Sequence, residues 1–355
     1  VDLGVMISAS HNPMPDNGIK FFAHGGYKLP DQVEDQIQEL LNTSWDRPTG
    51  AAVGEVEYDD DWAEKSYIEH LMTSLGTDLH GLRIAVDCAN GGASFLAPEA
   101  FRQAGADAVV INAAPDGRNI NDKAGSTHPE QLQALTVASE ADFGVAYDGD
   151  ADRCLAVDRD GNIVDGDKIM GALAVHMRDE GQLAKDTLVV TVMSNLGLIL
   201  AMQEAGIKTV QTGVGDRYVL EAMLEGGYSL GGEQSGHIIA KKYATTGDGI
   251  LSSLLLARMV KESGRDLADL TSFIKRLPQT LINVGGVDRS RANTDPAVQE
   301  AVAAAEAVLG NTGRVLLRPS GTEPLVRVMV EAATQSQADG VASRLADVVK
   351  ENLAL

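Results

Sequence analysis

The feature of this sequence that most constrains its fold is a strand, turn, helix and strand plan that occurs twice. The first copy spans residues 82–112, and the second spans residues 187–212. The helix of each copy ends in an Ala-Gly pair, at Ala104-Gly105 and Ala205-Gly206, before a short β-branched run. Because two strands joined by a helix are the building unit of α/β proteins, the repetition predicts duplicated α/β modules.

A chain of 355 residues is too long for one compact core, so we expect several domains. The acidic, aperiodic segment 46–61 indicates a linker. After Pro278 the pattern changes to strand, Ala-rich helix, two strands and a final helix, which predicts a smaller α+β domain. The run Leu3–Ile7 is strand-like with no start signal before it, so we expect a first domain truncated at its N-terminus. The predicted domains span residues 1–62, 63–166, 167–281 and 282–355.

The charge balance restricts the partners of the chain. With 29 Lys and Arg against 51 Asp and Glu, the net charge is -22, which repels nucleic acid and anionic lipid. No apolar run reaches the roughly 18 residues of a membrane span, and two cysteines, Cys88 and Cys154, give no disulfide framework. These features predict a cytoplasmic protein without nucleic-acid or membrane partners. An anionic small substrate would need locally clustered cations.

An acidic motif follows the expected strand 143–147. In an extended loop the alternate side chains of Asp148, Asp150 and Asp152 point the same way, and three close carboxylates repel unless a cation lies among them. Oxygen ligands alone suit Mg²⁺. The alternative is a solvated acidic turn, which Arg153 makes less favourable because its charge could neutralise a phosphate on the same ion.

A serine-containing turn follows the first strand. The segment Ser8-Ala-Ser-His-Asn-Pro13 presents two hydroxyls in a proline-rigidified loop, which suits a nucleophile. From the residues alone, a plain polar turn is equally compatible, and Ser8 and Ser10 compete. Lys20, further along, is a candidate acid, base or phosphate cation, or else a surface lysine.

Two later loops carry binding groups. Gly231-Gly-Glu-Gln-Ser-Gly-His237 offers donors and acceptors for sugar hydroxyls, although Glu233 and His237 taken singly are compatible with ordinary surface and loop roles. Arg318-Pro-Ser-Gly-Thr-Glu323, with Arg327, offers guanidinium groups, hydroxyls and a glycine-opened backbone for a phosphate. The alternative for the second loop is a hairpin turn with chance arginines.

Taken in order and spacing, these four loops resemble the signature loops of the α-D-phosphohexomutase superfamily. The Glu-Gln-Ser-Gly-His sequence at 233–237 and the segments Asn119–Asp122 and Gly125–His128 are similar to the bacterial phosphoglucosamine mutase branch. The resemblance implies a phosphohexomutase-like α/β protein of three related mixed α/β domains and a smaller C-terminal α+β domain, each giving one loop to the site.

The resemblance also implies a role for each matching residue. Ser10 corresponds to the phosphoserine and, through its phosphate, to a metal ligand beside Asp148, Asp150 and Asp152. Lys20, His237 and Arg153 correspond to catalytic groups. The residues that correspond to substrate-binding positions are Glu233, Ser235, Arg318, Ser320, Gly321, Thr322 and Arg327.

The implied reaction interconverts glucosamine 6-phosphate and glucosamine 1-phosphate through a 1,6-bisphosphate, in the supply of UDP-N-acetylglucosamine for the cell wall. The implied cofactors are one Mg²⁺ per chain and glucosamine or glucose 1,6-bisphosphate as activator. The implied partners are a phosphosugar and a kinase or bisphosphate donor that phosphorylates Ser10. A homodimer is one option for the oligomeric state.

Two departures from the family pattern bear on these expectations. The first domain lacks the upstream strands and the Arg-containing Gly-rich motif of the family, so we expect the domain that carries Ser10 to be incomplete. An incomplete first domain would make the chain inactive. Ala151 stands where many relatives have Gly, a change expected to preserve the turn if its φ is negative. The rival hypotheses are a phosphoglucomutase/phosphomannomutase, an inactive phosphosugar-binding fragment and, less favoured, a Mg²⁺-dependent phosphatase.

Overall fold

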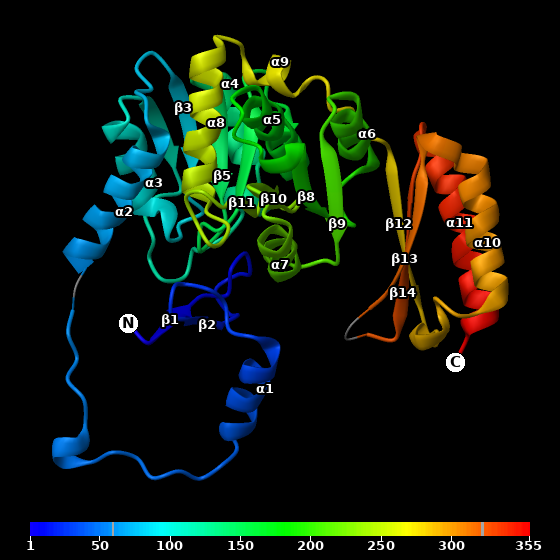
Figure 1. The fold of residues 1–355 in the computed structure, drawn as a ribbon, viewed down its shortest axis with the longest axis horizontal. Helices are drawn as coiled ribbons and strands as arrows, with labels where there is room; N and C mark the ends of the chain where they lie inside the picture. The colour runs from blue at the N-terminus through cyan, green and yellow to red at the C-terminus, as the bar shows by residue number, and fades with distance from the viewer. Residues whose placement is uncertain (59, 321–322) are drawn as a thin grey trace. The chain divides into compact units, whose positions relative to one another are not determined.

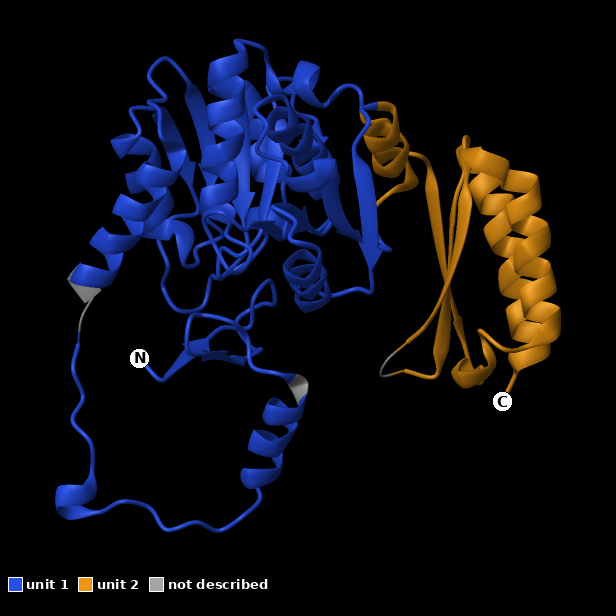
Figure 2. Ribbon diagram, viewed as in Figure 1, with its two compact units in different colours: residues 1–193, 205–273 blue, residues 194–204, 274–355 orange. Residues whose placement is uncertain are grey.

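The computed structural model describes residues 1–58, 60–320 and 323–355. By their contacts they form two compact units, coloured separately in Figure 2. Unit 1 comprises residues 1–193 and 205–273, and unit 2 comprises residues 194–204 and 274–355. Within the described parts of the chain, none of the helices combines the length and the apolar character that a membrane span requires.

The N-terminal part of unit 1 is a β-hairpin followed by a helix (Figure 1). Strands β1 (Leu3–Ile7) and β2 (Ile19–Ala23) pair antiparallel, with Ile7 opposite Ile19, so residues 8–18 form the connecting loop. The Ser8 N–H closes the base of this loop by donating to the Gly18 carbonyl at 2.9 Å. Helix α1 (Asp31–Leu40) and the short 3-10 helix η1 (Gly50–Ala52) follow.

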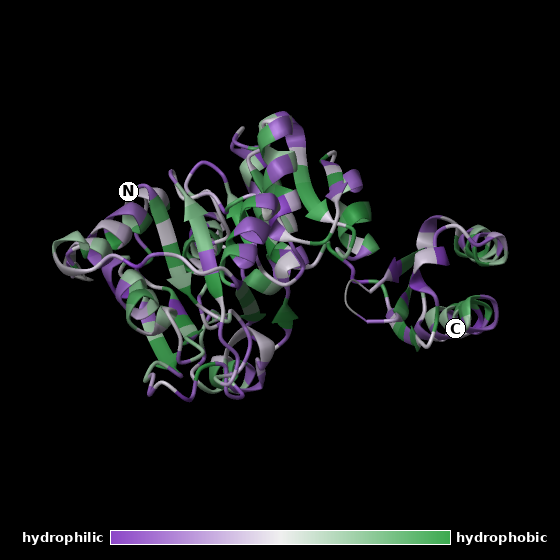
Figure 3. Ribbon diagram, turned by 90° about the horizontal axis from the view of Figure 1, so that it is seen from below, coloured by the Kyte–Doolittle hydropathy of each residue, from purple (hydrophilic) through white to green (hydrophobic). Residues whose placement is uncertain are grey.

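The first sheet of unit 1 contains one copy of the predicted repeat. Its strand order is β4-β3-β5-β6-β7, with β3, β4 and β5 parallel and two hairpins completing the edge. Strand β5 is buried along its whole length and β3 is buried after Arg83, and Figure 3 shows the strands of unit 1 as largely hydrophobic ribbons. The strands are β3 (Arg83–Asp87), β4 (Asp107–Ile111), β5 (Phe143–Tyr147), β6 (Cys154–Asp158) and β7 (Ile163–Val164), and the helices are α2 (Asp60–Leu75), α3 (Ala93–Gln103), η2 (Gly125–Thr127) and α4 (Glu130–Ala138).

The second sheet of unit 1 contains the other copy. Its order is β11-β10-β8-β9, and β8 pairs in parallel with both β9 and β10. The repeated plan is therefore confirmed as β3-α3-β4 and β8-α6-β9 along the chain, although α6 (Leu196–Glu204) belongs by its contacts to unit 2. The elements of unit 1 here are α5 (Gly166–Asp179), η3 (Ala184–Asp186), β8 (Thr187–Thr191), β9 (Lys208–Thr212), α7 (Asp216–Gly226), β10 (Leu230–Gly232), β11 (Ile238–Ala240), α8 (Gly249–Ser263) and α9 (Leu267–Thr271).

Unit 2 has the α+β order of strands and helices that was predicted for the end of the chain. An antiparallel sheet of order β12-β14-β13 is covered by two helices, whose apolar faces enclose Val298, Val328 and Val341. The elements are β12 (Gln279–Gly285), η4 (Arg289–Arg291), α10 (Pro296–Leu309), η5 (Gly310–Thr312), β13 (Arg314–Pro319), β14 (Leu325–Glu331) and α11 (Gln335–Leu353).

A buried carboxylate ties the sheet of unit 2 to the start of α6. Glu331 is fully buried and accepts from Arg314 Nε at 2.8 Å. It also accepts from the Asn195 amide at 3.2 Å and from the Leu196 N–H at 2.9 Å. One carboxylate therefore satisfies donors from a strand, a loop and a helix N-terminus.

Replacing this carboxylate should destabilise unit 2. Glu331→Ala removes the carboxylate that pairs with Arg314 and accepts from two further donors, so we expect a loss of about 3–5 kcal/mol in the free energy of unfolding. Urea unfolding monitored by circular dichroism measures it. Asp339→Asn is the control, because that carboxylate is exposed and pairs with Thr280 on the surface. A loss below about 1 kcal/mol for Glu331→Ala would contradict this account.

Candidate functional site

The serine loop between β1 and β2 presents its two hydroxyls to different carboxylates. Ser8 Oγ donates to Asp150 Oδ2 at 2.8 Å and accepts the Ser10 N–H at 2.9 Å. Ser10 Oγ donates to Asp148 Oδ2 at 3.1 Å. Ser10 has φ of 54°, in the left-handed region that a residue with a Cβ seldom adopts. Ser8 therefore supports the loop, and the strained backbone presents Ser10.

Two residues outside the serine loop fix its position. Asn121, 6% exposed, donates from its amide to the carbonyls of Ser10 and Asn12, each at 2.9 Å. A Cβ at Gly149 would lie 2.5 Å from the Ser10 carbonyl oxygen, so only glycine allows this close approach. The role of Asn121 was not predicted, since nothing local in the sequence indicates that its amide reaches a loop more than a hundred residues away.

The acidic loop lies directly after β5, where Asp148 begins the turn. Asp148, Asp150 and Asp152 each offer a carboxylate oxygen, and these oxygens lie within 4.8 Å of one another. The convergence expected from their alternation is therefore present. Ala151 was expected to preserve the turn if its φ were negative. That condition is not met, because its φ is 59°. Alanine bears the strain of a left-handed turn here that glycine would avoid.

The electrostatics of this loop favour a cation. Burial, followed by the charges of Asp152 and Asp150, raises the pKa of Asp148 to about 7. Two buried oxygens, Asp150 Oδ1 and Asp152 Oδ1, have no hydrogen-bond partner among the described residues. Unpartnered carboxylate oxygens at this spacing fit a hard cation such as Mg²⁺, which takes oxygen ligands.

A second cluster of possible metal ligands in the described part of the chain consists of His176, Glu180 and Glu262. His176 Nε2 lies 3.6 Å from Glu180 Oε1 and 3.4 Å from Glu262 Oε2. Arg258 already pairs with both carboxylates, at 3.0 and 2.8 Å. The cluster therefore has its own counter-charge and is an ion-pair network between α5 and α8.

Two cations border the acidic loop. Lys20 Nζ lies 2.5 Å from Asp150 Oδ2 and 3.3 Å from Asp152 Oδ2. Burial opposes its charge, but the hydrogen bond to Asp150 and the nearby negative charges leave the pKa of Lys20 raised, so it is an ammonium at neutral pH. Arg153 Nε lies 3.9 Å from Asp148 and 3.8 Å from Asp152, and no hydrogen-bond partner for it occurs in the part of the chain that the structure describes. Its guanidinium is therefore positioned to accept an anion as a further partner.

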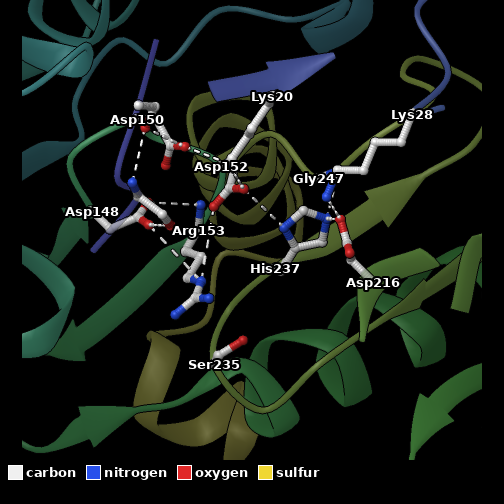
Figure 4. Close-up of polar contacts among 12 residues, drawn as sticks. Lys20, Lys28, Asp148, Asp150, Asp152, Arg153, Asp216, Ser235, His237 and Gly247 are labelled. Atoms are coloured by element: carbon white, nitrogen blue, oxygen red, sulfur yellow. Dashed lines mark hydrogen bonds and ion pairs between the residues drawn. The ribbon is translucent and has the colours of Figure 1, made fainter. Parts of the chain in front are cut away.

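His237 lies between two carboxylates, as Figure 4 shows. Its Nδ1 is 3.5 Å from Asp152 Oδ2, and its Nε2 is 3.5 Å from Asp216 Oδ2. The Gly247 N–H donates to Nε2 at 3.0 Å, so the ring hydrogen of the neutral tautomer is on Nδ1 and faces Asp152. Although burial would raise the pKa of Asp152, His237, Lys20 and Arg153 hold that pKa below its usual range.

Asp216 was not predicted as a site residue. It also pairs with Lys28, so polar contacts run from Lys28, in the segment that follows β2, through Asp216 to the histidine (Figure 4). Burial would raise the pKa of Asp216, but His237 and Lys28 lower it. The first helical position of α7 gave no sequence signal for this role, because an acidic residue there is common in any helix.

A cavity of about 370 Å³ adjoins these groups within unit 1, large enough for a small ligand. Lys20 and Lys28 supply cations to its wall, and Asp150 and Asp152 supply the acidic edge. Tyr67 also lines it and donates to both oxygens of Asp248 at 2.9 Å. The cavity therefore offers both charges to a polar ligand.

The predicted sugar loop lies between β10 and β11. Glu233 Oε1 accepts the Gly215 N–H at 3.1 Å, and Ser235 is exposed. Figure 4 shows Ser235 apart from the cluster of the acidic loop and His237, with no contact drawn to those groups. Ser235 Oγ donates to Glu233 Oε2 at 3.5 Å, and the Gln234 amide donates to Asp167 at 3.1 Å.

The predicted phosphate loop belongs to unit 2. Arg318 on β13 and Arg327 on β14 are direct cross-strand partners, a placement of like charges that costs stability unless an anion lies between them. Ser320 Oγ accepts the Glu323 N–H at 3.2 Å. Arg289, which was not predicted, donates to the Ser320 carbonyl and holds one side of the loop. The predicted ligands Gly321 and Thr322 lie outside the described residues.

Family models match successive stretches of the chain, each described as a part of phosphoglucomutase/phosphomannomutase. Residues 1–47 match alpha/beta/alpha domain I, and residues 65–161 match alpha/beta/alpha domain II. Residues 165–277 match alpha/beta/alpha domain III, and residues 281–348 match the C-terminal domain.

Curated relatives are similar over the full chain. The phosphoglucosamine mutase of Bifidobacterium longum subsp. infantis is 62% identical over 364 residues, which is 100% of this chain and 79% of that protein. The phosphoglucosamine mutase of Kineococcus radiotolerans is 60% identical over 362 residues, 100% of this chain and 80% of that protein.

Solved structures share the fold. One is Aspergillus fumigatus N-acetylphosphoglucosamine mutase in complex with GlcNAc-6P and magnesium, with a TM-score of 0.78, 22% identity, and 99% of this chain and 89% of that chain covered. Another is a phosphoglucomutase/phosphomannomutase family protein from Burkholderia thailandensis, with a TM-score of 0.79, 24% identity, and 99% and 77% covered. At these identities the likeness concerns the fold alone.

Proposed function

Because the chain belongs to the phosphoglucomutase/phosphomannomutase family, we propose that it is a mutase that interconverts glucosamine 6-phosphate and glucosamine 1-phosphate. The choice of sugar is supported by relatives of 62% and 60% identity that are named phosphoglucosamine mutases. The observation that carries the mechanism is the Ser10 hydroxyl, held 3.1 Å from a carboxylate of a three-aspartate loop by a strained backbone.

The proposed reaction has two phosphoryl transfers. Phosphorylated Ser10 gives its phosphoryl group to the 1-hydroxyl of glucosamine 6-phosphate, so the bond from phosphorus to Ser10 Oγ breaks and a bond to the sugar oxygen forms. After the 1,6-bisphosphate reorients in the site, Ser10 Oγ takes the 6-phosphoryl group and glucosamine 1-phosphate leaves. Each transfer moves one proton from the attacking hydroxyl and one to the leaving oxygen.

Lys20 and His237 are the proposed proton carriers. Lys20 is an ammonium beside Asp150, which suits a donor to the leaving Ser10 oxygen. His237 is the proposed acceptor, at Nε2, once the hydrogen bond from Gly247 is released. Arg153, whose Nε has no hydrogen-bond partner, would neutralise the group in transfer.

Asp148, Asp150, Asp152 and the phosphate on Ser10 would hold Mg²⁺. When bound, that ion would neutralise charge on the transferring phosphoryl group. Glu233 and Ser235 would bind sugar hydroxyls, and the donors of Arg318, Ser320, Gly321, Thr322 and Arg327 would bind a substrate phosphate.

The wider setting follows from the reaction. Glucosamine or glucose 1,6-bisphosphate, or a kinase, would supply the first phosphate on Ser10. The product would supply UDP-N-acetylglucosamine synthesis in the cytoplasm.

Sugar preference is the test of the proposed substrate. Coupled assays on glucosamine 6-phosphate, glucose 6-phosphate and mannose 6-phosphate, each with Mg²⁺ and glucose 1,6-bisphosphate, should give the highest kcat/KM for the amino sugar. A higher value for either neutral sugar would favour a phosphoglucomutase/phosphomannomutase instead. Binding without turnover of any of the three would favour a phosphosugar-binding fragment.

A further inference from the structure

The sugar loop rests on the first turn of helix α5. The Gly166 N–H donates to the Gln234 carbonyl at 3.1 Å. A Cβ at Gly166 would lie 2.4 Å from the Glu233 carbonyl oxygen and 2.6 Å from the Gly236 nitrogen, so the backbone of the loop lies directly against this turn. Only glycine fits at position 166, and the loop has no room to shift toward the helix.

One side-chain hydrogen bond fastens the same loop to the next residue of α5. Gln234 Nε2 donates to Asp167 Oδ2 at 3.1 Å, and Asp167 is only 2% exposed. A carboxylate in that position is stabilised by the helix N-terminus and by hydrogen-bond donors. An amide is a suitable partner because it can donate, whereas a carboxylate at position 234 would leave two acceptors facing each other.

The two side chains that flank Gln234 are the proposed sugar ligands. Glu233 and Ser235 are its chain neighbours, and Glu233 is held on its other side by the Gly215 N–H at 3.1 Å. Gln234 is the first central residue of a turn in which the Gly236 N–H donates to the Glu233 carbonyl at 3.0 Å, and its side chain is directed to Asp167. The bond to Asp167 holds this turn, which also contains Glu233 and Ser235. The direction of Glu233 and Ser235 therefore depends on the bond between Gln234 and Asp167.

We propose that Asp167 is a positioning residue of the sugar site, which fixes Glu233 and Ser235 by accepting the Gln234 amide. The inference rests on the proposed function, since it assigns a substrate role to these two side chains. Asp167 would affect sugar binding only through the position of the loop, and it would contact no reacting atom.

The pair permits an isosteric exchange of donor and acceptor. In Gln234→Glu, two carboxylates oppose each other and the bond is lost. In Gln234→Glu combined with Asp167→Asn, the new amide at position 167 donates to the new carboxylate at position 234, and the bond is restored in reverse. Asp167→Asn alone keeps an acceptor for Gln234.

The full chain with Mg²⁺ and glucose 1,6-bisphosphate should be assayed on glucosamine 6-phosphate. Q234E should raise KM about tenfold or more, while kcat falls less than about threefold, because the loop binds the sugar in ground and transition states alike. The double variant should restore KM to within about threefold of the wild-type value. D167N alone should keep KM within the same range, because the amide at position 167 still accepts from Gln234. A double variant no better than Q234E, or a Q234E enzyme with unchanged KM, would overturn the proposal.

Two measurements separate positioning from stability. Asn162→Asp is the matched control, because the Asn162 amide donates to the carboxylate of Asp158, 5% exposed, at 3.2 and 3.1 Å in the hairpin that joins β6 to β7. It should lower Tm and leave KM unchanged. A Q234E enzyme that lowers Tm in the same way without raising KM would contradict a positioning role.

Should Q234E fail to fold, the pair is tested by removal. Gln234→Leu, Asp167→Ala and their double variant break the same bond, so the double should raise KM no more than the worse single. Fully additive effects would overturn the inference. If the wild-type chain is inactive on glucosamine 6-phosphate, the proposed function itself is rejected. This outcome is distinct from a failure of the positioning role of Asp167.

Discussion

Ser10→Ala is expected to lose mutase activity by at least about a thousandfold, the largest effect of any single substitution in this chain. The reason is chemical, because the variant has no oxygen to carry the phosphoryl group, while the loop keeps its supports. Ser8 Oγ still bonds Asp150, and the Asn121 amide still holds the carbonyls at positions 10 and 12. The measurement is steady-state turnover of glucosamine 6-phosphate with glucose 1,6-bisphosphate and Mg²⁺.

Ser8→Ala is the matched control for the nucleophile. It removes a hydroxyl from the same loop, which supports the Ser10 N–H at 2.9 Å but does not carry phosphate in this account. We expect a loss of about tenfold, from a less well positioned loop. An inactive Ser8→Ala with an active Ser10→Ala would reverse the two roles.

Asp150→Asn is expected to have the second largest effect. Its carboxylate has one oxygen without a hydrogen-bond partner and another that holds both Ser8 and Lys20. Loss of that charge weakens a site whose ligands are otherwise Asp148, Asp152 and phosphate. We expect the Mg²⁺ concentration for half-maximal activity to rise more than about tenfold, and maximal activity to fall about a hundredfold.

Titration with Mg²⁺ in the mutase assay measures both quantities. Asp160→Asn removes an exposed carboxylate from the turn after β6, at the opposite end of that strand from the acidic loop, and serves as control, with unchanged Mg²⁺ dependence. An Asp150→Asn enzyme that saturates at the wild-type Mg²⁺ concentration would show that the three carboxylates are not the cation site.

Local patterns predicted much of the fold. The Ala-Gly ends of two helices marked the copies β3-α3-β4 and β8-α6-β9, because helix ends and buried strands have short-range signals. The α+β order of unit 2 followed from the same signals. Alternation predicted the convergence of Asp148, Asp150 and Asp152, since it depends only on extended backbone.

Other features depend on contacts between distant segments. Asn121 reaches Ser10 across 111 positions, and Lys28 reaches Asp216 across 188. The bond from Gln234 to Asp167 spans 67 positions. Each involves a polar residue of a common type whose partner only the tertiary fold brings near. Ala151 was misjudged because the sequence does not report φ, and its value of 59° reflects the turn that the acidic loop must make.

The central claim is that Ser10 carries the phosphoryl group. Peptide mass spectrometry of the full chain, after incubation with glucose 1,6-bisphosphate and Mg²⁺, locates that group directly. The account predicts phosphate on Ser10 that is lost when glucosamine 6-phosphate is added in excess. Phosphate on Ser8 instead, or full mutase turnover with neither serine phosphorylated, would contradict it.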